Sequence, residues 1–171
     1  MPTITTTLNR IRAHRPCEAG WTKLLAGLGK TKADDEPLAY ATILRINGIA
    51  DALWCCRAEP QHAAIWRMAA VRFARRVQHL MKDPRSLAAL DVAERHAQGL
   101  ATDAELAAAR AAGRAAARAA DDGGWAAARA AAWDAAFSAG RAAAWATAWD
   151  AAGDAGREAQ TTIFLELVGK D

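Results

Sequence analysis

Hydrophobic residues recur at three- and four-residue steps along most of this chain, the spacing that gathers side chains on one face of an α-helix. The pattern is longest between residues 60 and 81, where the apolar positions are Ile65, Met68, Ala69, Phe73, Val77 and Leu80. The arginines of this stretch fall between those positions, so we expect an amphipathic helix with its arginines off the core face. Asp83 and Pro84 should end it, because proline disfavours helical backbone in the residue before it.

Shorter apolar stretches predict further helices, separated by glycine, proline or polar loops. Thr102 and Glu105 have the spacing of a capping box, with Asp103 as a rival cap, ahead of an alanine-rich helix. The polar segment 30–36, "KTKADDE", is expected to be a loop whose acids favour the start of a helix at Pro37. No pair of alternating strands is predicted. The other stretches expected to be helical are residues 5–14, 16–28, 37–47, 49–58 and 84–99.

The stretch 125–149 repeats a bulky side chain at every fourth position on a background of alanine. Four residues turn an α-helix by about 400°, so the series winds around the helix as a slanting ridge. Two roles are open for these side chains. In the first, they pack between the side chains of neighbouring helices in the core. In the second, they are exposed, and tryptophan and arginine are enriched at the hot spots of binding surfaces. The ridge residues are Trp125, Arg129, Trp133, Phe137, Arg141, Trp145 and Trp149.

These patterns predict an all-α fold: an alanine-rich bundle of about seven or eight helices with a long C-terminal helix that carries the ridge. We expect an N-terminal helical subdomain over residues 1–58 and the alanine-rich bundle over residues 59–171. A chain of 171 residues is long enough to bury a hydrophobic core. The two parts are therefore expected to form one compact unit.

Composition adds limits to this picture. The chain is 53% hydrophobic but only 6% aromatic, which favours close-packed helices over a β-sandwich. The net charge of +3 is too small to require a nucleic-acid partner, although residues 1–100 carry +6 and residues 101–171 carry −3. No signal peptide, membrane span or disulfide framework is found among the apolar stretches and the three cysteines. We expect a cytoplasmic protein of a bacterial host, with no membrane contact.

Candidate catalytic and metal-binding residues are few. Cys55 and Cys56 are adjacent and are expected to point to different sides of a buried helix. An enzyme would need a pocket that gathers His79 or His96 with one of these thiols. The acidic run 34–36 favours a helix-capping loop over a divalent-ion site. We therefore predict no cofactor, no metal and no catalytic residue.

The arginines of the 60–81 helix are the main candidates for contacts with phosphate groups. Arg67, Arg72, Arg75 and Arg76, together with the basic N-terminus, form such a set. The acidic second half would repel a nucleic-acid duplex lying along it. A protein partner that carries both acidic and basic patches suits this division of charge between the two halves of the chain. Nucleic acid is therefore the weaker alternative.

Several short elements follow one another between residues 71 and 120. An Ala-Arg-x-Val element leads to a Pro-Arg break, an Ala-Glu-Arg element, a glycine and an alanine-rich run. This order resembles a family of alanine-rich, helical immunity proteins found near bacterial toxin genes. The segments "RPCEAGWTKLLAGLGKTKADDEPL" and "NGIADALWCCRAE" are similar to small proteins of bacteriophages and prophages. The residues of the matching elements are Ala74, Arg75, Val77, Pro84, Arg85, Ala93, Glu94, Arg95 and Gly99.

The resemblance implies a small non-enzymatic protein of mobile elements that binds and neutralises another protein. For a phage-borne copy the implied target is a host defence complex, such as a CRISPR effector. We therefore expect an inhibitor of the anti-CRISPR type, with a toxin-blocking immunity protein as the first alternative and a nucleic-acid-binding helical module as the second. The residues expected to bind the protein partner are Arg72, Arg75, Arg76, Trp133, Arg141, Trp145 and Trp149.

Overall fold

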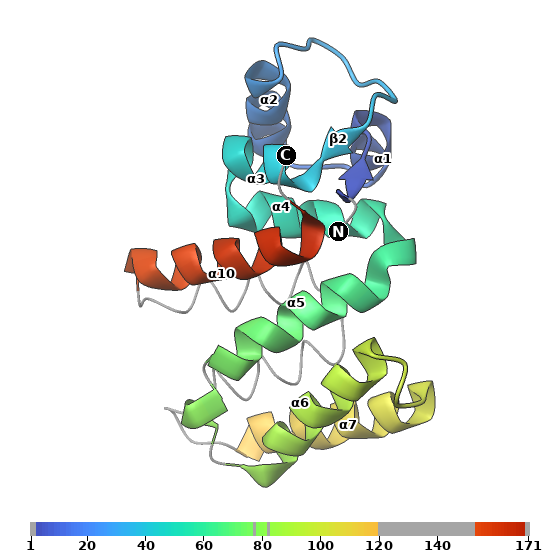
Figure 1. The fold of residues 1–171 in the computed structure, drawn as a ribbon, viewed down its shortest axis with the longest axis vertical. Helices are drawn as coiled ribbons and strands as arrows, with labels where there is room; N and C mark the ends of the chain where they lie inside the picture. Colours follow the sequence, from blue (N-terminus) through green and yellow to red (C-terminus); the bar gives the residue numbers. More distant parts are fainter. Residues whose placement is uncertain (1–2, 77, 82, 120–152, 170–171) are drawn as a thin grey trace.

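The computed structural model describes residues 3–76, 78–81, 83–119 and 153–169, and most of them lie in helices (Figure 1). In chain order the elements are β1 (Thr5–Thr6), α1 (Leu8–Ala13), α2 (Glu18–Gly27), β2 (Leu38–Ala39), α3 (Tyr40–Asn47), α4 (Ile49–Cys55), η1 (Cys56–Ala58), η2 (Pro60–His62), α5 (Ala63–Arg76), η3 (Gln78–Leu80), α6 (Pro84–Ala97), α7 (Asp103–Ala119) and α10 (Gly153–Val168). The predicted all-α fold is confirmed. The ridge expected over 125–149 lies outside the described residues.

One short strand pair corrects the expected helices near the N-terminus. Thr5 and Thr6 form β1, which pairs antiparallel with Leu38 and Ala39 of β2. The helices expected from residues 5 and 37 therefore begin later, and the expectation of no strand pair is wrong. Threonine favours extended backbone. Thr7 then ends the strand segment by capping α1, since its Oγ1 accepts a hydrogen bond from the N–H of Arg10.

Several predicted helix ends coincide with their sequence signals. α3 ends at Asn47, and Gly48, with a φ of 90°, allows the reversal into α4. Asp83 caps α6 with Pro84 at its first turn. The capping box is present as well: the Thr102 hydroxyl accepts from the N–H of Glu105 at 3.2 Å, and the Glu105 carboxylate accepts from the N–H of Thr102 at 2.7 Å. Thr102, not Asp103, is therefore the cap of α7.

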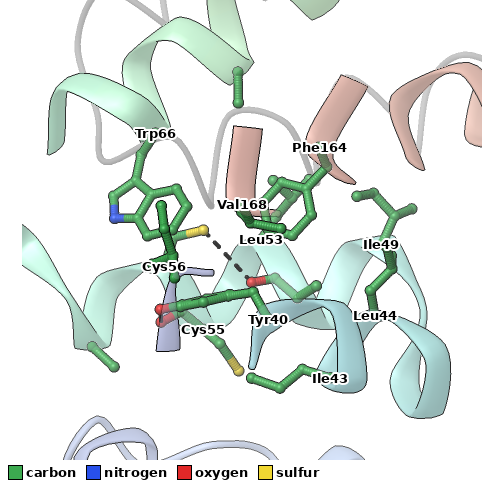
Figure 2. Packing of buried hydrophobic residues seen from close by; sticks show 14 of the residues in the cluster. Tyr40, Ile43, Leu44, Ile49, Leu53, Cys55, Cys56, Trp66, Phe164 and Val168 are labelled. Atoms are coloured by element: carbon green, nitrogen blue, oxygen red, sulfur yellow. Dashed lines mark hydrogen bonds between the residues drawn. The ribbon is translucent and has the colours of Figure 1, made fainter. Parts of the chain in front are cut away.

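The larger hydrophobic cluster, the first core, joins the N-terminal elements to α5 and α10. Trp66 of α5 lies at its centre, with ring centroids 4.9 Å from Tyr40 and 6.2 Å from Phe164. Figure 2 shows these rings together with aliphatic residues of α3 and α4. The segment before β1 and the end of α10 also meet here, because the N–H of Ile4 donates to the carbonyl of Val168 at 2.8 Å. The first core thus draws residues from both sides of residue 58.

A smaller cluster, the second core, lies between α5, α6 and α7. Its buried residues are Val71, Ala74, Met81, Leu90, Ala93 and Leu106. Figure 1 shows α5 lying between α10 on one side and the α6–α7 pair on the other. Trp66 and Phe73 face the first core, whereas Val71 and Ala74 face the second. α5 is therefore the helix that both cores share.

Candidate functional site

Three of the predicted partner-binding residues lie on the C-terminal half of α5. The Arg72 guanidinium contacts the Glu166 carboxylate of α10 at 3.2 Å. Arg75 reaches α6, where it contacts Asp91 at 2.6 Å and Glu94 at 2.5 Å. Arg76 is exposed. The charges of Arg72 and Arg75 are thus compensated within the chain, and both residues connect neighbouring helices.

The remaining predicted binding residues, Trp133, Arg141, Trp145 and Trp149, lie outside the described residues. The same holds for the rest of the ridge over 125–149. These residues stay predictions.

The two adjacent thiols are part of the first core. Burial raises the pKa of the Cys55 thiol to about 12, and it also raises the pKa of Cys56 well above its ordinary value. The Cys56 thiol faces the carbonyl of Ala52 at 3.6 Å. The thiolate is the nucleophilic form of cysteine, so burial disfavours the reactive form of both groups.

The two histidines considered as partners of these thiols lie in the other half of the molecule. His79 is exposed in η3, and His96 of α6 contacts Arg67 and Asp103. The structure therefore does not bring either of them together with Cys55 or Cys56. The contacts that His96 makes could not be predicted from the sequence, because its partners lie on two other helices.

The acidic run 34–36 is held by neighbouring side chains. Lys30 donates to the carboxylates of Asp34 at 2.5 Å and Glu36 at 2.6 Å, which raises the pKa of Lys30 and lowers that of Asp34. Asp35 accepts from the side-chain amide of Asn9 at 2.9 Å. The expected helix-capping role is wrong, since the N-cap position of α3 is Ala39. No cluster with metal-ligating composition occurs among the residues that the structure describes.

An open apolar hollow lies where α10 packs beside α3 and α4. Its volume is about 390 Å³, and the residues that line it are Ala41, Leu44, Arg45, Gly48, Ile49, Thr161 and Leu165. Arg45 is exposed and supplies the only charged side chain in this lining. The sequence did not indicate this hollow, because α10 joins α3 and α4 only through the fold. An apolar surface with one cationic side chain suits contact with an amphipathic segment of another protein.

No family profile, curated protein or solved structure matches this chain. Within the described ranges, none of the helices combines the length and the apolar character needed to cross a bilayer.

Proposed function

We propose that this protein is a non-enzymatic inhibitor carried by a bacteriophage or mobile element. In this proposal it neutralises a bacterial defence complex of the CRISPR-effector kind by binding it stoichiometrically in the host cytoplasm. The observation that carries the proposal is the open apolar hollow between α3, α4 and α10. The resemblance of the sequence to immunity proteins and phage proteins supplies the biological setting.

The hollow has the chemistry of a docking site for an amphipathic helix or loop. Leu44 and Ile49 line the hollow and are buried residues of the first core, so this part of the surface is already formed without a partner. A preformed surface lowers the entropy that binding must overcome. Exposed Arg45 favours a partner that carries acidic residues beside its apolar anchor, because complementary charge increases the association rate.

The nucleic-acid alternative gains less support from the described residues. Arg72 and Arg75 contact carboxylates of this chain, so a phosphate backbone would have to compete with Glu166, Asp91 and Glu94. Such competition removes much of the electrostatic gain that non-specific nucleic-acid binding needs. A toxin-blocking immunity protein would use the same hollow, and only the identity of the target separates it from a defence inhibitor.

The proposal is tested by phage plating on a panel of bacterial strains that each carry one defence system. Expression of the protein should restore plating on one of them, and adding it to the purified effector should abolish activity at a fixed molar ratio. Restored plating on none of the strains, combined with neutralisation of a toxin encoded beside the gene, would establish the immunity alternative instead. Inhibition at far less than one molecule per effector would contradict stoichiometric binding.

Two variants test the hollow itself. Arg45→Glu reverses the charge in its lining, and Thr161→Arg places a long cation where the partner's apolar side chain would lie. Both should lower the affinity for the purified target about tenfold or more, which corresponds to about 1.4 kcal/mol or more. Arg12→Glu on α1 is the matched control, because Arg12 is exposed and lies away from the lining. Equal affinities of all three variants would place the binding surface elsewhere.

A further inference from the structure

A chain of polar contacts crosses from α5 through α6 to α7. Nη1 of Arg67 lies 2.9 Å from Nδ1 of His96, and Nε2 of His96 lies 2.7 Å from Oδ1 of Asp103. A guanidinium can only donate, so Nδ1 must be the acceptor and His96 is neutral, with its Nε2–H donating to Asp103. The His96 side chain is only 16% exposed. Arg67 is therefore held in one orientation by a neutral ring.

Arg110 and Arg114 follow Asp103 along α7 by seven and eleven residues, which places all three on the face of the helix from which Asp103 contacts His96. The Nε of Arg110 is buried and has no hydrogen-bond partner. Arg114 follows one turn later and is exposed. Burial lowers the pKa of Arg110, and the positive charges of Arg67 and Arg114 lower it further. Burial also lowers the pKa of Arg67. Arg110 thus lies partly buried beside the positive charges of Arg67 and Arg114.

Asp103, the carboxylate that contacts His96, does not compensate the three positive charges. Asp103 has a side chain that is 98% exposed, and its Oδ1 is already bonded to His96. Three guanidinium groups and one carboxylate give the group a net charge of +2. Partly buried cations with unused donors are stabilised by an anion that accepts from several of them at once.

We propose that Arg67, Arg110 and Arg114 form a binding site for a phosphate dianion, either free or as a phosphomonoester. Its charge of about −2 near neutral pH matches the group, and it offers three or more acceptor oxygens to guanidinium groups from two helices. A single carboxylate carries half of that charge and two oxygens. His96 and Asp103 are positioning residues that orient Arg67. The inference goes beyond the proposed function and does not rest on it.

The experiment measures thermal unfolding and calorimetric binding on the full-length protein with inorganic phosphate at about 1–10 mM. This range is low enough to limit the general stabilisation that phosphate gives to most proteins at high concentration. Chloride at equal ionic strength is the reference. The wild-type Tm should rise with phosphate, and Arg110→Gln should remove the rise. Arg12→Gln, an exposed arginine on α1, should keep it. A phosphate-dependent rise in Tm that is equal in all three proteins, or that is absent in the wild type, would contradict the proposed site.

Two further arms sharpen the assignment. The affinity for phosphoserine is compared with the affinity for inorganic phosphate. Tighter binding of phosphoserine would identify a phosphomonoester as the ligand, and tighter binding of inorganic phosphate would identify the free ion. Acetate at equal ionic strength should have no effect, and an effect equal to that of phosphate would reduce the site to a general cationic patch. In phosphate-free buffer Arg110→Gln should unfold at the same Tm as the wild type or higher, because it removes one repelling charge. A lower Tm there would make Arg110 a structural residue and contradict the proposal.

The role of His96 is tested by rescue. His96→Ala should weaken phosphate binding about tenfold, because Arg67 loses its orienting acceptor. His96→Gln retains an acceptor for Arg67 and a donor for Asp103, so it should recover most of the affinity. Equal binding by both variants would remove His96 from the site. All of these measurements use the isolated protein, so their failure would leave the partner-binding proposal standing.

Discussion

The two cores of the molecule meet at α5 and are built in different ways. In the first core the rings of Tyr40, Trp66 and Phe164 pack with centroids 4.9–6.2 Å apart. In the second core Ala74 and Ala93 are buried, and no aromatic side chain belongs to it in the part of the chain that the structure describes. Large rings fill space between elements, whereas small residues let helix backbones approach closely.

Charged contacts border both cores, but most of those between neighbouring helices lie at the second. The second core is bordered by ion pairs between helices, such as Arg75 with Glu94 and Arg95 with Glu105. The first core is stabilised mainly by the apolar area that its large side chains bury. We therefore expect the first core to respond most to truncation of a side chain, and the second to respond to enlargement, to pH and to salt.

Trp66→Ala should give the largest loss of stability. The indole is 3% exposed and its Nε1 donates to the carbonyl of Glu59 at 2.9 Å. Removing it leaves a large cavity and an unpaired carbonyl, which should reduce the free energy of unfolding by about 3–5 kcal/mol. Urea denaturation measures the change. Trp54→Ala is the matched control, because Trp54 is only half-buried. Its substitution should reduce the free energy of unfolding clearly less. Equal losses would show that the aromatic centre is not what stabilises the first core.

Ala93→Leu tests the close approach of helices in the second core. Ala93 is fully buried between α6 and its neighbours. The added carbon atoms have no space, so the free energy of unfolding should fall by about 1–3 kcal/mol. Ala88→Leu introduces the same side chain at an exposed position of α6 and should have little effect. An Ala93→Leu protein as stable as the wild type would mean that α5, α6 and α7 are loosely packed.

Much of the fold could be predicted because its signals are local. The glycine after α3, the Asp-Pro start of α6 and the capping box of α7 each act within a few residues, through backbone geometry or hydrogen bonds to the first turn. The strand pair β1–β2 could not be predicted in this way. Each strand has two residues, which is too short to show an alternating pattern, and its partner lies in a distant segment.

The contacts of charged side chains were the least predictable feature. Arg67 was expected to lie off the core face, yet it points toward His96, which is 29 residues away in the sequence. The helical pattern places Arg67 beside the face of α5 that carries Val71 and Ala74. Which residue meets it there depends on how α6 packs against α5. The periodicity of the sequence predicts the helix face on which a charged side chain lies. The residue that it contacts depends on how the helices pack in the tertiary structure.

Thr102→Ala should have a smaller effect, confined to the start of α7. The loss of one capping hydroxyl should reduce the free energy of unfolding by about 1 kcal/mol. Hydrogen bonds from the N–H and hydroxyl of Thr102, and then from Arg95, lower the pKa of Glu105 below its ordinary value of 4.5. A carboxyl group with a lowered pKa stabilises the folded state above the pKa it has when unfolded.

The stabilising contribution of Glu105 is therefore present at neutral pH and is lost as the pH falls from about 4.5 through the folded-state pKa. Glu105→Gln should remove this pH dependence, because glutamine does not titrate. Urea denaturation of both proteins between neutral and acidic pH measures the difference. If the difference in stability between wild type and Glu105→Gln stays constant down to acidic pH, the capping box does not involve the ionised carboxylate.

The smallest expected effects are the couplings within two ion pairs, Arg75 with Glu94 and Arg72 with Glu166. The side chains of Arg75 and Glu94 are 32% and 34% exposed, so water screens much of the attraction at their distance of 2.5 Å. A double-mutant cycle with Arg75→Gln and Glu94→Gln should give a coupling free energy of about 0.2–1 kcal/mol. The same cycle for Arg72 and Glu166, which are more exposed and 3.2 Å apart, should give less.

High salt tests whether Arg75 joins α5 to α6 through its charge or through packing of its aliphatic stem. About 1 M salt shortens the screening length to about 3 Å, so it should remove most of the Arg75–Glu94 coupling. The loss caused by Ala93→Leu should hardly change under the same conditions, because it arises from steric overlap. A coupling that persists unchanged in high salt would mean that the aliphatic part of Arg75 joins the helices. In that case the second core would be stabilised by apolar contacts like the first, and the contrast between the two would rest on side-chain size alone.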